Sequence, residues 1–371
     1  MIRSLRRGKR RAGLIGIGGT STEHLKSQGK NMFSSSEYQL LDFGRGRRLE
    51  RFGDLILDRL CPVAQNMTLD NPSLWEQADA RFLEDPDSTG TQNLNIKKNA
   101  ASGVRGEWFP LTEKGRAFFG DISSNGNFSS KIKKDSGDEQ NTSGVRSWCI
   151  HHDHAKITLE LKGSPFGHLG VFPEQSANWD MIFDQCRKEE KRRGQISVLN
   201  LFAYTGGSTL AAASAGAKVT HLDAAKNIVQ QGRRNAEFSF PDRMPEIHWI
   251  TDDAVRFVNR ERKRQHQYDG LILDPPSYGH GAHGEVWRIS RDLPGLMEAA
   301  VSLLNDSFSF ILLTCHTRGF EYPVLKKMVC ELLRSRFDLF SDFHVISDSM
   351  SILSLSGKRF PAGDRFWIAR K

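Results

Sequence analysis

The sequence lacks two features that would place it in a membrane or in an oxidising compartment. Among its 371 residues, no run approaches the ~18 consecutive apolar residues that a membrane-spanning helix requires, so we expect no membrane contact. Its five cysteines are odd in number and include no C-x-x-C pair, which argues against a disulfide framework and against a structural zinc site. We therefore expect a chain without a bound metal that resides in a reducing cytoplasm.

Net positive charge is nearly absent outside the first 30 residues. The formal net charge is +8, but residues 1–30 contain eight lysines and arginines against one glutamate. Such a segment can bind nucleic acid through its phosphates, although its composition favours a disordered extension, which we predict over residues 1–35. Residues 121–147 are rich in Ser, Asn, Gly, Asp and Lys and contain few apolar side chains, which predicts a flexible insertion.

The remainder of the N-terminal half is predicted to be a small β domain. In residues 38–60, short apolar runs are separated by Gly44, Gly46 and Gly53, a pattern typical of β-hairpins. We place this mostly β N-terminal domain, with its insertion, at residues 36–165. The aromatic residues scattered through it are interpreted as its core: Trp75, Phe82, Trp108 and Phe109.

Residues 166–371 alternate between strand and helix patterns. Strands are predicted at 198–203, 219–222, 247–250, 268–273 and 308–313, with two closing strands at 343–346 and 366–369. Helices are predicted at 173–193, 208–215, 225–238, 254–265, 293–304 and 322–336, and a loop at 274–287. This alternation predicts an α/β fold: a doubly wound, Rossmann-like sheet of seven strands that binds its ligands at the carboxyl ends of the strands.

The turn after the first strand of this sheet contains two adjacent glycines, Gly206 and Gly207. A dinucleotide-binding turn requires the spacing G-x-G-x-x-G and a P-loop requires G-x-x-x-x-G-K-[ST], and the sequence has neither here. The two glycines still let a ligand approach the backbone closely. We therefore expect a ligand with a nucleoside and a carboxylate but no phosphate chain, such as S-adenosylmethionine. An NAD-dependent dehydrogenase is the remote alternative.

Acidic residues end three successive strands of the predicted sheet. Asp223 ends the second strand and would accept hydrogen bonds from both ribose hydroxyls. Asp253, after the third strand, would accept a hydrogen bond from the adenine amino group, and Asp252 is the second candidate for that role. Asp252 also has an ordinary structural explanation, as the N-cap of a helix. Asp274 ends the fourth strand and would add negative charge near the sulfonium. Solvated loop ends do not account for this recurrence, so the sequence predicts an S-adenosylmethionine-dependent methyltransferase.

Three motifs then carry a resemblance to a known family. The stretch 198–217 followed by H-L-D, the T-D-D-A at 251–254 and the L-D-P-P-S-Y-G at 273–279 resemble the class I S-adenosylmethionine-dependent methyltransferases of the bacterial large-subunit rRNA type, the RlmI and RlmK group. The G-x-F-x-D-Q-R segment of that family has its counterpart in G-V-F-P-E-Q at 170–175, where Glu174 replaces Asp. The resemblance covers about residues 166–313 and includes no counterpart of the PUA RNA-binding domain.

The resemblance implies an activity and a set of cofactor-binding residues. The activity is methylation of a base, at cytosine carbon 5 or on guanine, in large-subunit rRNA, with RNA as the partner. The cofactor-binding residues are Gln175, Phe202, Ala203, Thr205, Gly206, Gly207, Asp223, Asp252, Asp253, Ala254 and Asp274.

The D-P-P-S-Y segment provides most of the candidate catalytic residues. Pro275 and Pro276 have no N–H to donate, so with Asp274 they form a rigid, extended turn. Carbonyl groups of such a turn can accept hydrogen bonds from a flipped base while Tyr278 stacks on its face; a plain turn with a buried tyrosine is the alternative. The glycines that follow suggest a mobile loop that closes over the substrate, with Trp287 as its anchor.

Cys315, after the fifth strand, is a candidate nucleophile. Methylation at carbon 5 of cytosine requires a thiolate that first adds to carbon 6, and RlmI-type enzymes have this cysteine in a T-C-S segment after the same strand. Here the sequence is T-C-H, and a neighbouring imidazole, that of His316, can lower the pKa of a thiol. The alternative is a small buried hydrophobic residue. Transfer to a nitrogen would then need no covalent step.

Two further functions stay open at this point. A methyltransferase for a protein or a small molecule is supported by the near-neutral charge outside residues 1–30. A non-catalytic RNA-binding module is disfavoured by the intact acidic residues and the D-P-P-S-Y motif.

Overall fold

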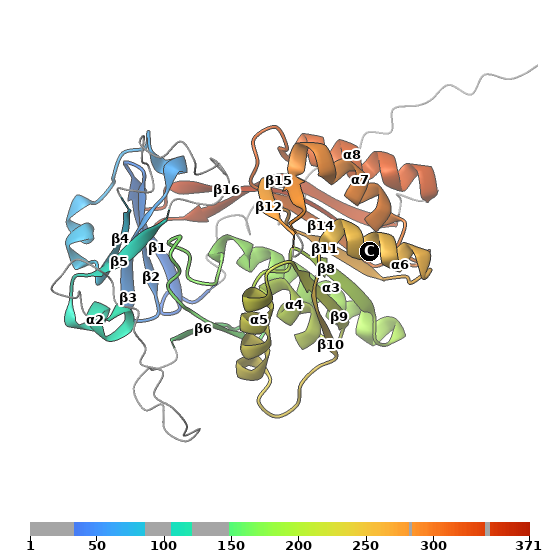
Figure 1. Ribbon diagram of the computed structural model, residues 1–371, viewed down its shortest axis with the longest axis horizontal. Coiled ribbons are helices and arrows are strands. Elements are labelled where there is room, and N and C mark those ends of the chain that lie inside the picture. Colours follow the sequence, from blue (N-terminus) through green and yellow to red (C-terminus); the bar gives the residue numbers. More distant parts are fainter. Residues whose placement is uncertain (1–32, 86–104, 121–147, 282–283, 338–341) are drawn as a thin grey trace, which may run out of the picture.

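Two large β-sheets lie side by side in the protein (Figure 1). The computed structural model describes residues 33–85, 105–120, 148–281, 284–337 and 342–371. A five-stranded sheet is built from the N-terminal part of the chain and a seven-stranded sheet from the C-terminal part. The predicted insertion, 121–147, and nearly all of the predicted tail lie outside the described residues.

The N-terminal sheet contains the predicted hairpins. Strands β1 (Tyr38–Gly44), β2 (Arg47–Phe52) and β3 (Leu55–Leu60) pair antiparallel in sequence order, and β4 (Ala80–Glu84) joins β3 in parallel and β5 (Gly106–Pro110) antiparallel. Short helices η1 (Pro62–Ala64), η2 (Pro72–Gln77) and α2 (Glu113–Phe119) complete this part. Of the predicted core aromatics, Phe82 and Trp108 are buried, whereas Trp75 is half-buried and Phe109 is exposed.

The seven-stranded sheet confirms the predicted fold class. Its spatial order is β10 (Ile247–Thr251), β9 (Lys218–Asp223), β8 (Ser197–Leu201), β11 (Gly270–Leu273), β14 (Phe310–Cys315), β16 (Arg359–Arg370) and β15 (Phe343–Leu353). The first five strands run parallel, and β16 runs antiparallel to both of its neighbours. The central strands are largely buried and mostly apolar because helices cover both faces of the sheet.

Helices pack against both faces of this sheet and bury two hydrophobic clusters. On one face lie α3 (Ser176–Arg193), which follows the single turn η4 (Pro173–Gln175), then α4 (Gly207–Ser214) and α5 (Lys226–Ser239). The other face is covered by α6 (Ala254–Lys263), α7 (Ile289–Val301) and α8 (Tyr322–Arg336). Within the described residues, none of these helices has the length and apolar composition needed to cross a membrane.

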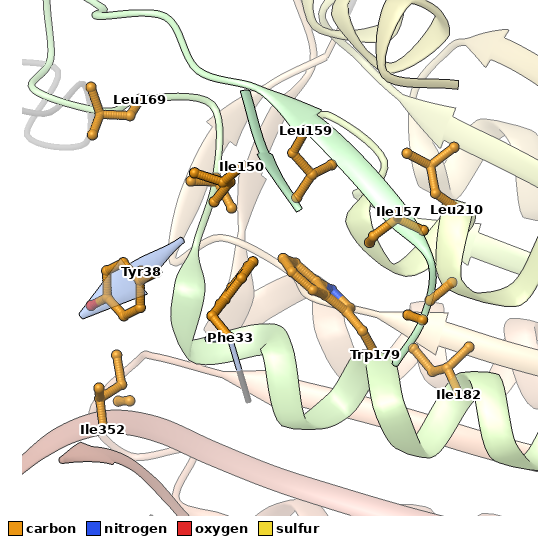
Figure 2. Packing of buried hydrophobic residues seen from close by; sticks show 14 of the residues in the cluster. Phe33, Tyr38, Ile150, Ile157, Leu159, Leu169, Trp179, Ile182, Leu210 and Ile352 are labelled. Atoms are coloured by element: carbon orange, nitrogen blue, oxygen red, sulfur yellow. The ribbon is translucent and has the colours of Figure 1, made fainter. Parts of the chain in front are cut away.

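The first of these clusters is continuous with the core of the N-terminal sheet. Figure 2 shows Trp179 of α3 between Phe33 and the apolar side chains of Ile157 and Leu210. Phe33, which we assigned to the tail, is only 3% exposed and meets the rings of Tyr38 and Trp179 edge-on. Phe33 therefore belongs to the packed core and not to a tail, and the boundary predicted between residues 165 and 166 stays a prediction.

The closing hairpin is much longer than the two four-residue strands we predicted. Strands β15 and β16 have 11 and 12 residues, and their distal ends reach the N-terminal sheet. There Leu40 bridges to Ser354, and the rings of Phe43 and Phe360 lie 5.1 Å apart. A strand keeps its alternating apolar residues only where a neighbouring surface buries them. The length of β15 and β16 therefore depends on the N-terminal sheet.

Two short hairpins lie outside the two large sheets. Residues 274–287, predicted as a loop, contain β12 (Tyr278–His280) paired antiparallel with β13 (Val286–Arg288), and α7 begins at Ile289, four residues early. The hairpin of β6 (Cys149–His152) and β7 (Ile157–Glu160) packs through β7 on α5. Asn235 of α5 accepts a hydrogen bond from the Glu160 backbone at 2.8 Å, which ties this hairpin to the larger sheet.

Candidate active site

A cavity opens at the carboxyl edge of the seven-stranded sheet. It lies where β8, β11 and β14 end and where η4 and α3 begin. Seven of the predicted residues line it: Gln175, Phe202, Ala203, Thr205, Gly206, Gly207 and Asp274. The other lining residues, which sequence reasoning did not single out for this site, are Leu159, Val171, Phe172, Trp179, Asn200, Tyr204, Ser208, Ile272, Leu312 and Thr314.

Asp223 supports the turn that forms one wall of this cavity. Its carboxylate accepts hydrogen bonds from the backbone N–H groups of Tyr204 (2.9 Å) and Ala225 (3.0 Å). Phe202 and Tyr204 both have left-handed backbone angles, with φ of 56° and 50°, a conformation that costs energy for residues with a side chain. Burial raises the pKa of Asp223, against the opposing effect of these backbone hydrogen bonds. A carboxylate can accept about four hydrogen bonds, so Asp223 retains acceptor capacity for a hydroxyl donor.

The two glycines of the turn are needed for different reasons. Gly206 has φ of 96° and precedes α4, a left-handed position that glycine adopts without strain. A Cβ on Gly207 would lie 2.5 Å from the Trp179 ring. Both glycines line the cavity, and at Gly207 the Trp179 ring is a second reason for the absence of a side chain; close approach of a ligand to the two glycines stays a prediction.

Asp274 lies at the centre of a hydrogen-bonded group. Its Oδ1 accepts a hydrogen bond from the Thr314 hydroxyl (2.7 Å), and its Oδ2 accepts one from Nε2 of Gln175 (2.9 Å). Gln175 is 6% exposed and comes from η4, whereas Thr314 comes from β14. Both donors are neutral, so they orient the carboxylate in the cavity without cancelling its charge; Nε2 of His316 lies 3.9 Å from Oδ1 and forms an ion pair with it only when the imidazole is protonated.

Asp252 and Asp253, our two candidates for the adenine contact, both have hydrogen-bond partners within the protein. Asp253, not Asp252, is the N-cap of α6, and its Oδ1 accepts a hydrogen bond from the backbone N–H of Arg256 at 2.8 Å. Asp252 is buried and binds Arg256 (2.7 Å) and Arg260 (2.8 Å). Burial alone would raise the pKa of Asp252, but the hydrogen bonds from the two arginines outweigh it and lower that pKa. Neither carboxylate lines the cavity, nor does Ala254, so their contacts with adenine stay a prediction.

The D-P-P-S-Y segment leads from the cavity to the surface. Pro275 is buried and Pro276 is exposed, and the Pro276 carbonyl accepts a hydrogen bond from Nε1 of Trp287 at 2.7 Å. Trp287 also packs against Phe202, with ring centroids 4.9 Å apart, so it anchors the β12–β13 hairpin to the cavity wall. Tyr278 is half-buried at the start of this hairpin and outside the cavity lining, and its stacking role stays a prediction.

Cys315 lies on the opposite face of β14 from the cavity. Successive side chains of a strand point to opposite faces, and Thr314 lines the cavity while Cys315 packs in the cluster beneath α7 and α8. The thiol is 1% exposed, and burial raises its pKa despite a 3.4 Å hydrogen bond from the backbone N–H of Thr317. The expectation that His316 lowers this pKa is wrong. The geometry supports the alternative of a small buried hydrophobic residue, and a covalent role is left as an untested prediction.

The residues that we missed had a signal in the sequence. Phe172 belongs to the quoted segment at 170–175, and its ring lies 5.0 Å from that of Tyr204. Thr314 directly precedes Cys315, so strand alternation would have placed it on the cavity face once Leu312 was known to lie there. Asn200, by contrast, sits within an apolar strand, and its partner Thr209 is visible only in the fold.

The cavity suits a ligand that carries positive charge and no phosphate chain. Among the described residues that line it, none is lysine or arginine, while Asp274 contributes a carboxylate. Asp223 stands beside the same turn with lone pairs for ribose hydroxyls. S-adenosylmethionine has a sulfonium, two ribose hydroxyls and no phosphate, so the residues present fit it. In the part of the chain that the structure describes, no group of His, Cys, Asp and Glu side chains could hold a metal ion.

Comparison with known proteins agrees with this geometry. Residues 152–309 match the family model described as S-adenosylmethionine-dependent methyltransferase. These residues form an S-adenosylmethionine-dependent methyltransferase domain. The prediction of an S-adenosylmethionine-dependent methyltransferase is thereby confirmed for this part of the chain.

Relatives of the methyltransferase domain share one name. The ribosomal RNA large subunit methyltransferase I of Cronobacter sakazakii is 25% identical over 168 residues, which are 45% of this chain and 39% of the relative. Its namesake in Aeromonas salmonicida is 33% identical over 185 residues, 49% and 43% of the two chains. The chain thus spans about two fifths of the length of the curated relatives it matches.

One solved structure is similar over nearly the whole chain. The S-adenosylmethionine-dependent methyltransferase from Agrobacterium tumefaciens superposes with a TM-score of 0.69 at 25% identity. The match covers 90% of this chain and 91% of that protein, so it includes the N-terminal sheet as well as the methyltransferase domain.

Proposed function

We propose that the protein transfers the methyl group of S-adenosylmethionine to a base of large-subunit rRNA. The observation that carries this proposal is the position of Asp274. It lies in the cavity, held by Gln175 and Thr314, and is followed at once by the two prolines of the rigid turn. A turn of this kind places acceptor groups beside the transferable methyl group, where a flipped base can enter. The relatives named for large-subunit rRNA support the choice of RNA.

Each residue of the site has a defined task in this proposal. Asp223 binds the ribose hydroxyls of the cofactor, and the carboxylate of Asp274 stabilises the positive sulfonium. The bound cofactor supplies an electrophilic methyl group, which an unprotonated nitrogen can attack in one step. The Pro276 carbonyl is already engaged by Trp287, so the amino edge of the base is left to Asp274 and the Pro275 carbonyl. Tyr278 stacks on the base.

We favour a nitrogen of the base, as in guanine, over carbon 5 of cytosine. Carbon 5 becomes nucleophilic only after a thiolate adds to carbon 6, and Cys315 faces the helices beneath the sheet with a raised pKa. A thiol in such surroundings is inert. Nitrogen has its own lone pair and needs only orientation and loss of a proton.

Mass spectrometry of rRNA nucleosides from a deletion strain tests this function. We expect one methylated base to disappear from large-subunit rRNA and to return when the purified protein and S-adenosylmethionine are added to that RNA. Complementation with Cys315→Ala should restore the modification, whereas Asp274→Asn should not. An unchanged nucleoside profile would contradict rRNA as the acceptor and favour a protein or a small molecule. If the lost base is 5-methylcytosine and Cys315→Ala does not restore it, the choice of nitrogen is wrong.

A further inference from the structure

A row of buried side chains connects the cavity with the last strand of the sheet. Oδ2 of Asp274 accepts from Nε2 of Gln175 (2.9 Å), and Oε1 of Gln175 accepts from Nδ2 of Asn178 (2.6 Å). Oδ1 of Asn178 then accepts from Nη1 of Arg365 on β16 (3.0 Å). Asn178 is fully buried and Arg365 is 5% exposed. The guanidinium is held in turn by both carboxylate oxygens of Asp348, each at 2.9 Å.

The two ends of this row determine the direction of every hydrogen bond in it. An arginine side chain can only donate, and an ionised carboxylate can only accept. Asn178 must therefore turn its oxygen to Arg365 and its NH₂ to Gln175. Gln175 must in turn present its oxygen to Asn178 and its NH₂ to Asp274. Primary amides have nearly the same shape in either orientation, so without a donor at the far end the two amides could reverse together.

We propose that Arg365 is a positioning residue for the methyl-transfer site, acting through Asn178 and Gln175 on Asp274. The proposal rests on the proposed function, because it assigns Asp274 to the sulfonium of bound S-adenosylmethionine. In the observed direction, Nε2 of Gln175 donates to Asp274 and lies 3.4 Å from the Thr314 hydroxyl. That hydroxyl then directs its own proton to the carboxylate.

Reversal of the row would remove the hydrogen bonds that hold the Asp274 carboxylate in place. Oε1 of Gln175 would face the carboxylate at the distance where a donor now lies, and the Thr314 proton could turn to Oε1. The carboxylate would lose both donors and meet an acceptor instead, so repulsion would turn it away from its position in the cavity. A displaced Asp274 attracts the sulfonium of S-adenosylmethionine less, but its displacement has little effect on the neutral thioether of S-adenosylhomocysteine.

The substitution Asn178→Asp tests this direction with almost no change in shape. An aspartate at position 178 accepts from Arg365 but has nothing to donate to Gln175, so Gln175 reverses to donate to it. We expect the dissociation constant of S-adenosylmethionine, measured by calorimetry, to rise about tenfold relative to that of S-adenosylhomocysteine, a difference of about 1.4 kcal/mol. A simple effect of the added negative charge has the opposite sign, because it would favour the cationic ligand.

Two further variants keep the test decisive. The sulfur of Met350 lies 3.3 Å from Nδ2 of Asn178 but does not determine the direction of the hydrogen bonds in the row. In Met350→Leu, the ratio of the affinities for S-adenosylmethionine and S-adenosylhomocysteine should therefore stay at the wild-type value. Asn178→Leu interrupts the row without adding charge and should give a ratio between those of wild type and Asn178→Asp. It also replaces Asn178→Asp if that variant does not fold.

The outcomes separate the two proposals. If the wild-type protein binds neither ligand, the proposed function fails. If the wild type binds both and Asn178→Asp changes both affinities equally or not at all, Arg365 has only a structural role and the positioning proposal is overturned. Selective loss of S-adenosylmethionine affinity in a variant that retains S-adenosylhomocysteine binding would support it.

Discussion

Asp223 offers the sharpest test of the cofactor assignment, because its carboxylate has two separable tasks. It accepts the backbone N–H groups of Tyr204 and Ala225, and it is proposed to accept the ribose hydroxyls of the cofactor. In Asp223→Asn, one acceptor oxygen is replaced by an NH₂ group. Loss of one hydrogen bond to a charged group costs about 1.5–3 kcal/mol, which corresponds to a roughly 10- to 100-fold rise in the dissociation constant. Asp223→Ala removes both acceptors and should weaken binding further.

Isothermal titration calorimetry with S-adenosylhomocysteine measures this effect without knowledge of the methyl acceptor. Asp269→Asn is a matched control, since Asp269 also accepts a backbone N–H, that of Ser197 at 2.7 Å, but precedes β11 at the opposite edge of the sheet. It should lower the free energy of unfolding and leave the affinity unchanged. Affinity of wild type should also fall in acid, as pH drops through the raised pKa of Asp223 and the carboxylate is protonated. Equal affinity of wild type and Asp223→Asn would refute the ribose assignment.

Three further predictions concern the thiol, the turn and a buried histidine. Cys315→Ala should retain wild-type methyl transfer to rRNA in a filter-binding assay, and loss of activity in a folded variant would restore the covalent route. Gly207→Ala should lower the free energy of unfolding by about 1–3 kcal/mol in urea, because the new methyl group meets the Trp179 ring, and a neutral effect would contradict this packing. Burial lowers the pKa of His221 to about 3 in the folded protein, whereas the pKa of an unfolded histidine is about 6.5. Below pH 6.5 the unfolded chain therefore binds a proton at His221 that the folded chain does not, and the free energy of unfolding falls by up to ~1.4 kcal/mol per pH unit. Urea unfolding at pH 7 and pH 5 should show a smaller difference for His221→Gln than for wild type, and an equal difference would count against the shift.

The sequence predicted most of the larger sheet because its signals are local. Each parallel strand is a short apolar run, and each helix has its own periodicity and end signals, so α8 was predicted with the bounds observed, Tyr322–Arg336. The same logic located Asp223 and Asp274 at strand ends. Parallel strands bring their carboxyl ends to one edge, which makes a shared site there a consequence of topology.

Prediction failed where a distant surface determines the local structure. The closing hairpin extends beyond its four predicted residues per strand because the N-terminal sheet buries Ile352 and Phe360. The residues immediately around these two strands give no sign of that surface.

The sequence by itself determined the fold class and the class of cofactor, and it placed Asp223 and Asp274 at strand ends, because strand ends and glycine turns are properties of short segments. Only the tertiary structure decided which of these groups meet. Because side chains alternate along β14, Thr314 lines the cavity and Cys315 packs in the core. Which of the two lines the cavity depends on the face of the sheet where the cavity lies. Arg365, nearly 100 residues after Asp274 in the chain, reaches the site only because β16 inserts beside β14.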